Sequence, residues 1–224
     1  MNAKLRKILM ILAVALVAVG MQSCLDDDDN DYSRIYPNAI VTMKNIDGDT
    51  WFQLDDSTLL YPVNLKGDVL NKEVRAFVNF RDAGKGEIAN DKARNVWVNW
   101  IDTVRTKSMA QAMEVDSAAV GNDPVEIVND WSTVCEDGYL TLRFRTYMSG
   151  YTQHKVNLVA TNNPYEVRLY HDACGDRSTR VADGVVAFRL DKLPDTQGKT
   201  VDLTLKWKSF SGEKSVKFKY RTRK

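Results

Sequence analysis

Residues 201–220 read VDLTLKWKSFSGEKSVKFKY, and this stretch decides the fold class. Apolar side chains occupy every second position from Val201 to Trp207, which is the period-2 pattern of a strand with one buried face. A turn signal at 211–213 leads into a second alternating run that ends at Tyr220. The stretch therefore predicts a β-hairpin with one apolar and one wet face.

The same alternation recurs upstream in the second half of the chain. Leu140, Leu142 and Phe144 alternate with polar residues, and further short apolar runs surround Val156, Tyr165–Tyr170 and 186–190. Six or seven such strands at regular spacing are typical of two packed antiparallel sheets. We therefore expect an antiparallel β-sandwich over residues 125–224.

The first half of the mature chain contains shorter strands and closer turns. Asp47-Gly48-Asp49 is a tight turn signal, and residues 74–81 alternate in hydropathy. The run 96–101 contains Trp97 and Trp100, which indicates a strand buried on more than one side. Five short strands in about 65 residues favour a small closed barrel over residues 37–106.

Residues 107–124 separate these two predicted domains. The segment 107–119 contains good helix formers but a poor apolar pattern, and a turn-rich stretch at 121–124 ends it. We interpret 107–124 as a connector.

The N-terminus has the three parts of a lipoprotein signal peptide. Basic residues precede a 12-residue apolar run, 8–19, which is too short to span a bilayer, and small or polar residues then lead to Cys24. We expect cleavage after residue 23 and lipid attachment to Cys24, which would anchor the mature chain to a bilayer. A secretory signal with an incidental cysteine and a short anchor helix are the alternatives.

Residues 24–36 are expected to form an acidic, lipid-anchored tether. The acidic run consists of Asp26, Asp27, Asp28 and Asp29. Such a run directly after a lipidated cysteine is similar to the surface-export signal of Bacteroidota lipoproteins, which predicts an outer-membrane, cell-surface location. The alternative is a solvated spacer that faces the periplasm.

The charge balance argues against a nucleic-acid partner. The chain has 31 basic and 30 acidic residues, and the signal segment holds three of the basic ones, which leaves 28 against 30. A mature chain near −2 lacks the bulk positive charge of nucleic-acid-binding proteins.

If Cys24 carries lipid, two cysteines remain in the exported chain. Cys135 and Cys174 are therefore candidates for a disulfide, with two separate thiols as the alternative. Their separation in space decides between the two.

The candidate chemical groups do not assemble into a recognisable catalytic motif. His171, Asp172 and Cys174 lie within four residues, but a structural zinc site needs four ligands, usually as two spaced pairs. The carboxylates of Asp55 and Asp56 are typical turn formers rather than a hydrolase pair. We expect no enzyme activity, no metal and no cofactor.

The C-terminal hairpin carries a candidate basic binding face. Its residues are Lys206, Lys208, Lys217, Lys219 and Arg221. Such a face could contact an anionic glycan, lipid headgroups or an acidic protein. The alternative is that lysines on exposed strands discourage edge-to-edge association.

Several short strings, taken in order, resemble the NigD-like lipoprotein family. They are the acidic run after Cys24, then YPNAIVT (36–42), FQLDD (52–56), KEVRAFVNF (72–80), NPY (163–165) and WKSFSG (207–212). The resemblance implies an N-terminal OB-type domain and a C-terminal β-sandwich, in agreement with the strand pattern.

The family name also implies a function. It comes from a bacteriocin locus, so the resemblance implies a non-enzymatic lipoprotein that binds a protein partner in self-protection or a related envelope role. The alternative is a glycan-binding accessory of outer-membrane carbohydrate handling.

Overall fold

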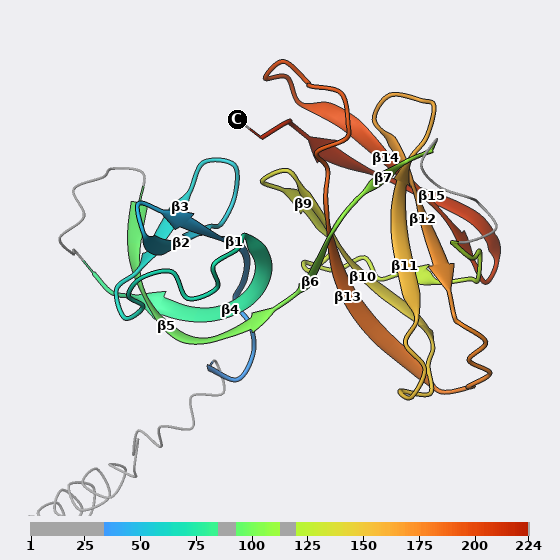
Figure 1. Cartoon of the computed structure of the whole chain (residues 1–224), viewed down its shortest axis with the longest axis horizontal. Helices are drawn as coiled ribbons and strands as arrows, with labels where there is room; N and C mark the ends of the chain where they lie inside the picture. The colour runs from blue at the N-terminus through green and yellow to red at the C-terminus, as the bar shows by residue number, and fades with distance from the viewer. Residues whose placement is uncertain (1–33, 85–92, 113–119, 224) are drawn as a thin grey trace, which may run out of the picture. The chain divides into compact units, whose positions relative to one another are not determined.

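The computed structural model describes residues 34–84, 93–112 and 120–223, and its regular elements are the strands β1 to β15. No α-helix occurs among these described residues. Residues Pro37–Lys224 form one compact unit that contains a barrel and two further sheets (Figure 1). The predicted all-β class is confirmed.

Five strands close the barrel. In barrel order they are β1 (Ala39–Ile46), β2 (Asp49–Gln53), β3 (Leu59–Pro62), β5 (Ala93–Thr103) and β4 (Val74–Asp82), and β4 returns to pair with β1. The contact between β3 and β5 is parallel, and the other four are antiparallel. The small closed barrel expected from the strand pattern is confirmed, and five strands agree with the OB-type domain that the family resemblance implies.

The turn between β1 and β2 shows how local sequence sets the register. Asp47 and Gly48 both have positive φ, 55° and 91°, as the central residues of a two-residue hairpin turn require. Ile46 and Asp49 pair directly on either side of them. The predicted turn is confirmed.

The barrel encloses its own apolar core. Buried side chains of this core include Val41, Met43, Phe52, Leu60 and Val78. The expectation for β5 was wrong: Trp97 is 44% exposed, because β5 has one wet face, and Arg81 lies over its ring at 5.4 Å.

The sandwich consists of two sheets. The first sheet has the order β6 (Arg105–Ser108), β13 (Val181–Arg189), β10 (Tyr139–Tyr147) and β8 (Glu126–Ile127), and β9 (Val134–Glu136) also pairs with β10. The second sheet has the order β15 (Gly212–Tyr220), β14 (Val201–Ser209), β12 (Glu166–Asp172), β11 (Lys155–Ala160) and β7 (Ala110–Gln111). Most pairings are antiparallel, while β13–β6, β12–β14 and β11–β7 are parallel.

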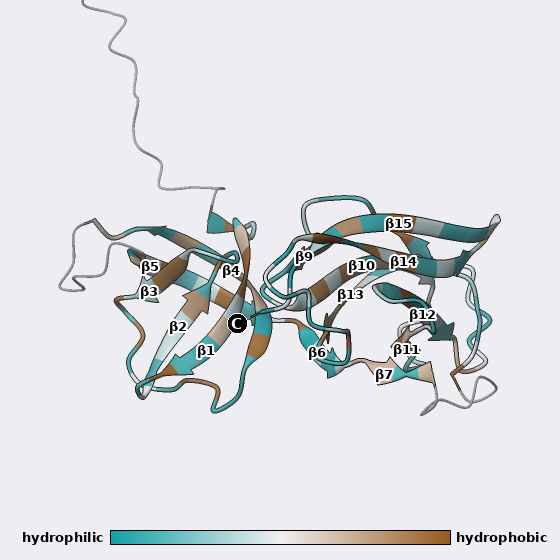
Figure 2. Cartoon of the chain, turned by 90° about the horizontal axis from the view of Figure 1, so that it is seen from above, coloured by the Kyte–Doolittle hydropathy of each residue, from teal (hydrophilic) through white to brown (hydrophobic). Residues whose placement is uncertain are grey.

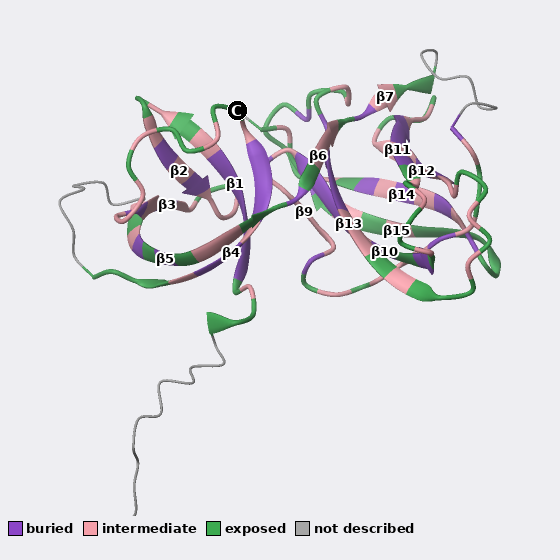
Figure 3. Cartoon of the chain, turned by 60° about the horizontal axis from the view of Figure 1, so that its bottom comes forward, coloured by how far each residue is buried: buried purple, intermediate pink, exposed green. Residues whose placement is uncertain are grey.

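The inner faces of the two sheets supply a second apolar core. The alternating residues predicted to point inward are buried, among them Leu142, Phe144, Leu203, Leu205 and Trp207. Hydropathy alternates along the strands (Figure 2), and buried residues lie within the barrel and the sandwich (Figure 3). The hairpin predicted over residues 201–220 is the antiparallel pair β14–β15.

The segment expected to be a connector contributes to the sandwich instead. Strand β6 pairs with β13, and β7 pairs with β11, so residues 107–111 already belong to the two sheets. Met109, between these strands, is 2% exposed and packs in the sandwich core. These strands could not be predicted from the sequence, because they are four and two residues long. Runs that short do not show an alternation of apolar and polar residues.

In the described part of the chain, no helix has the length and apolarity needed to cross a membrane.

Candidate functional site

The residues expected to anchor and export the chain lie outside the described part. Cys24 and the run Asp26–Asp29 fall within residues 1–33. The structure therefore contributes nothing to these expectations.

The expected basic face is a real sheet face, but acidic side chains accompany it. Strands β14 and β15 pair antiparallel, with Thr204 opposite Lys217 and Asp202 opposite Lys219. Residues directly opposite in an antiparallel pair point to the same side, so the predicted basic residues of the two strands share one face.

Ion pairs balance most of the charge on this face. Lys219 Nζ lies 2.7 Å from Asp202 Oδ1, and Lys217 Nζ lies 3.6 Å from Asp202 Oδ2. Lys206 pairs with Glu166 at 2.8 Å, and Arg221 pairs with Asp56 at 3.2 Å; Lys208 shows no ion pair in the described residues. Basic and acidic side chains therefore alternate on this face, which weakens the hypothesis that it binds an anion.

The expected disulfide does not form in the structure, where Cys135 and Cys174 are both free thiols. Cys135 lies on β9 of the first sheet, whereas Cys174 follows β12 of the second sheet and is exposed. Burial raises the pKa of the Cys135 thiol to about 12, so this group is not an activated nucleophile.

The two histidines and one aspartate form a buried hydrogen-bonded chain. His154 Nδ1 lies 2.9 Å from His171 Nε2, and His154 Nε2 lies 3.2 Å from Asp176 Oδ2. Hydrogen bonds from Ser149 hold the pKa of Asp176 well below its usual range, while burial lowers the pKa of His171. The geometry fits His154 donating a hydrogen bond to Asp176 and accepting one from His171.

This chain does not have the order of a hydrolytic triad. A triad needs a nucleophile hydrogen-bonded to the histidine, but Ser149 Oγ bonds to Asp176 Oδ2 at 2.7 Å instead. The described residues also hold no group of three or more metal-ligating side chains.

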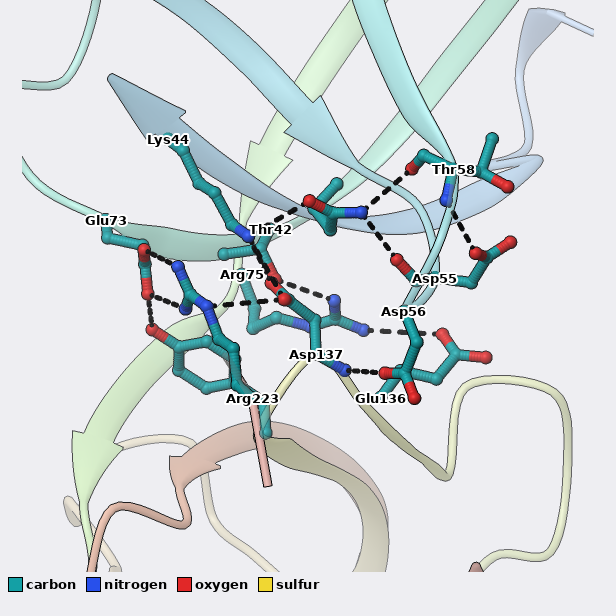
Figure 4. Close-up of polar contacts among 12 residues, drawn as sticks. Thr42, Lys44, Asp55, Asp56, Thr58, Glu73, Arg75, Glu136, Asp137 and Arg223 are labelled. Atoms are coloured by element: carbon teal, nitrogen blue, oxygen red, sulfur yellow. Dashed lines mark hydrogen bonds and ion pairs between the residues drawn. The ribbon is translucent and has the colours of Figure 1, made fainter. Parts of the chain in front are cut away.

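A dense set of charged residues lies where barrel residues meet sandwich residues; we call it the junction cluster (Figure 4). Its members are Lys44, Asp56, Glu73, Arg75, Glu136, Asp137, Arg221 and Arg223, all of them labelled in Figure 4 except Arg221. Four are basic and four are acidic, and each lies within 4.0 Å of an opposite charge.

Arg75 is the buried centre of the junction cluster. Its side chain is 0% exposed. Its guanidinium donates to Thr42 Oγ1 at 3.0 Å and to Thr141 Oγ1 at 3.4 Å, and it lies 4.0 Å from Glu136. Burial lowers the pKa of Arg75, and Glu136 and Asp137 oppose that shift.

The rest of the junction cluster is built around Asp137 and Glu73. Lys44 Nζ lies 3.0 Å from Asp137, and Arg223 Nε lies 3.4 Å from the same carboxylate. Glu73 accepts two 2.7 Å hydrogen bonds from Arg223 and one from the hydroxyl of Tyr139. A cavity of about 270 Å³ lies beside these groups. Because its charges are mutually paired, the cluster serves to join barrel and sandwich strands.

The pair Asp55 and Asp56 follows its expected role as turn former. Asp55 Oδ1 accepts hydrogen bonds from the backbone amides of Ser57 and Thr58, at 2.8 Å each. Asp56 accepts from the amide of Asp137. Both carboxylates are engaged in structural contacts.

Three exposed apolar residues form what we call the aromatic patch: Tyr147, Val181 and Phe210. Tyr147 on β10 and Val181 on β13 are directly opposite in the pairing, and they are 45% and 56% exposed. The ring of Phe210 meets that of Tyr147 edge-on, with centroids 5.2 Å apart and planes at 71°. Sequence reasoning missed the patch, since Phe210 lies in a turn and Tyr147 ends a strand.

Family comparisons agree with the barrel and the sandwich. Residues 40–104 match the NigD-like N-terminal OB domain, and residues 108–220 match the NigD-like C-terminal β-sandwich domain. The chain belongs to the NigD-like family. The predicted family and both of its domains are thereby confirmed, and the C-terminal match begins before β7.

Solved structures resemble this NigD-like chain over most of its length. A protein of Parabacteroides distasonis, provisionally named toxin-related, is 32% identical with a TM-score of 0.66, over 82% of this chain and 92% of its own. A NigD-like immunity protein of Bacteroides caccae is 19% identical with a TM-score of 0.58, covering 82% and 96%. A Bacteroides fragilis protein provisionally named a lipoprotein is 15% identical with a TM-score of 0.57, covering 83% and 98%.

At these identities, the last two structures show the shared fold alone. No curated protein sequence matches the chain.

Proposed function

We propose that this chain is a non-enzymatic, lipid-anchored envelope protein that binds a protein partner in self-protection against an antibacterial toxin. The aromatic patch carries this proposal. Tyrosine and other aromatic residues are enriched at protein interfaces and often dominate their binding energy. An exposed Tyr147–Phe210 pair with Val181 beside it has that composition.

The geometry of the rings favours a protein partner over a glycan. A sugar ring stacks on a flat aromatic face, whereas the rings of Tyr147 and Phe210 are inclined at 71°. A second exposed aromatic, Trp131, meets Phe77 at 76°. The names of the similar proteins, toxin-related and immunity protein, point in the same direction.

The proposed location is the outer membrane, with the mature chain held through lipidated Cys24 and exported to the cell surface by the acidic run. The basic residues before the apolar run 8–19, and Cys24 after it, form the sequence pattern of a lipoprotein signal peptide. The name of the Bacteroides fragilis structure supports lipid attachment.

A protection assay tests the proposed function. Cells that lack the chain, cells that carry it, and cells that carry Cys24→Ala are exposed to antibacterial toxins from related strains. We expect the native chain to protect against at least one toxin, and Cys24→Ala to leave the membrane fraction and lose protection. Equal killing of all three strains by every toxin would contradict self-protection, and membrane retention of Cys24→Ala would contradict lipidation.

A further inference from the structure

A cavity of about 390 Å³ opens at one edge of the sandwich, away from the junction cluster. It is lined by β6 and β13 of the first sheet and by β11, with the residues just before it, of the second sheet. Lys107 of β6 spans the two sheets, since its Nζ donates to Asn157 Oδ1 at 2.8 Å and to the carbonyl of Val156. We call this cavity the seam pocket; its volume is within the range of small-molecule sites.

The polar lining of the seam pocket is cationic. Arg105, Lys107 and Lys155 contribute basic groups, Gln153 and Asn157 contribute amides, and no lining residue is acidic. In the described part of the chain, Arg105, Lys107 and Lys155 make no ion pair. Other partly buried cations, such as Lys44, Arg143, Arg168 and Arg223, each face a carboxylate.

The seam pocket therefore gathers positive charge that the chain itself does not neutralise. Burial lowers the pKa of Lys107, and the neighbouring Arg105 lowers it further. A bound anion would relieve both effects, because an opposite charge stabilises the protonated amine. His154 also lines the pocket, but both of its ring nitrogens are already engaged, one by His171 and the other by Asp176.

The apolar lining reaches the sandwich core. Phe144, Val156 and Val186 line the pocket and are all buried core residues. Gly184, directly opposite Phe144 in the β10–β13 pairing, leaves room for its ring: a Cβ at 184 would lie 2.5 Å from Phe144 Cζ. The pocket thus combines an aromatic and aliphatic lining with cationic groups.

We propose that the seam pocket binds a small organic carboxylate with an apolar body. The carboxylate would contact Arg105, Lys107 and Lys155, and the amides of Gln153 and Asn157 could donate to it. The apolar body would lie against Phe144 and Val156. This site is separate from the aromatic patch, so it does not depend on the proposed protein partner.

Titration with three probes tests the proposal on purified residues 26–224, which include the whole of the compact unit Pro37–Lys224. The probes are octanoate, neutral octanamide and inorganic phosphate, followed by backbone amide NMR shifts. We expect octanoate to bind saturably and at least about tenfold more tightly than either other probe, with shifts centred on Asn157, Gly184 and Val185. Equal binding of octanamide would overturn the role of charge, equal binding of phosphate would overturn the organic class, and absence of saturation or shifts elsewhere would overturn the site.

Variants on exposed residues avoid disturbing the fold. Arg105→Ala/Lys155→Ala should weaken octanoate binding at least about tenfold, because both cations are removed. The matched control Lys206→Ala/Lys208→Ala removes two lysines from β14 and should leave the affinity unchanged. Equal effects of the two double variants would overturn the seam pocket as the binding site.

Discussion

Arg223, next to the last residue of the chain, forms two 2.7 Å hydrogen bonds with Glu73, which lies 150 residues earlier at the entrance to β4. The geometry is bidentate, which makes Arg–carboxylate pairs both strong and specific. Tyr139 adds its hydroxyl to the same carboxylate. The C-terminal end of the sandwich is therefore tied to the barrel.

Glu73→Gln should lower the free energy of unfolding by about 1–2 kcal/mol, since it removes a charged acceptor of several hydrogen bonds. Urea unfolding of the soluble chain measures the change. Arg221→Ala is the matched control: its partner Asp56 is 42% exposed, and such an exposed pair contributes less than about 1 kcal/mol. An equal loss in the two variants would contradict the special role of Glu73.

The same pair predicts a pH dependence. Burial alone would raise the pKa of Glu73, but hydrogen bonds from Arg223 and Tyr139 lower it below its ordinary value of 4.5. A carboxyl whose pKa is depressed in the folded state contributes stability above its unfolded pKa and loses it as the pH falls through the folded pKa. The stability difference between the native chain and Glu73→Gln should thus be constant from pH 7 to about 5 and shrink below 4.5. A difference that grows on acidification would contradict this assignment.

The contact between Gly184 and Phe144 gives a packing prediction. Gly184→Ala should destabilise the chain by about 1–3 kcal/mol, because the added methyl group meets the buried ring. Phe144→Leu should relieve that clash, so the double variant should be more stable than the sum of the single changes indicates. Thermal or urea unfolding of the four chains measures the coupling. Strict additivity would show that the ring moves away freely.

The acidic run predicts a location phenotype. Replacing Asp26–Asp29 with alanine should leave the protein in the membrane fraction but protect it from protease added to intact cells, because only the export signal is lost. The control replaces Lys66 and Lys72, two other charged residues, with alanine and should leave the protein cleavable. If protease still cleaves the aspartate variant on intact cells, the acidic run is a spacer and not an export signal.

Strand pattern and turn chemistry predicted the fold because both are local. Leu203, Leu205 and Trp207 are buried as their alternation indicated, and Asp47-Gly48 forms the turn that its residue types require. Arg75 shows the limit of that reasoning. Because Arg75 alternates with Val74 and Ala76, the pattern placed it on the wet face of β4. Sandwich residues such as Thr141 contact its side chain there, and Arg75 is completely buried.

The candidate sites were less predictable, because they join residues from distant parts of the sequence. Lys107 meets Asn157 across 50 positions, and Arg223 meets Glu73 across 150. The candidate basic residues share one face of the sheet, but the carboxylates of Glu166 and Asp202 balance their charge. The spacing of the lysines alone did not specify those contacts.

Crosslinking capture tests the proposed protein-binding function most directly. The baits are residues 26–224 of the native chain, the patch variant Tyr147→Ala/Phe210→Ala, and the control Tyr151→Ala, whose side chain is 98% exposed outside the patch. On intact cells and envelope extract, we expect one recurrent protein to crosslink to the native chain and the control and to be lost from the patch variant. Recovery of the same proteins by all three baits, or of carbohydrate without protein, would contradict binding through the aromatic patch.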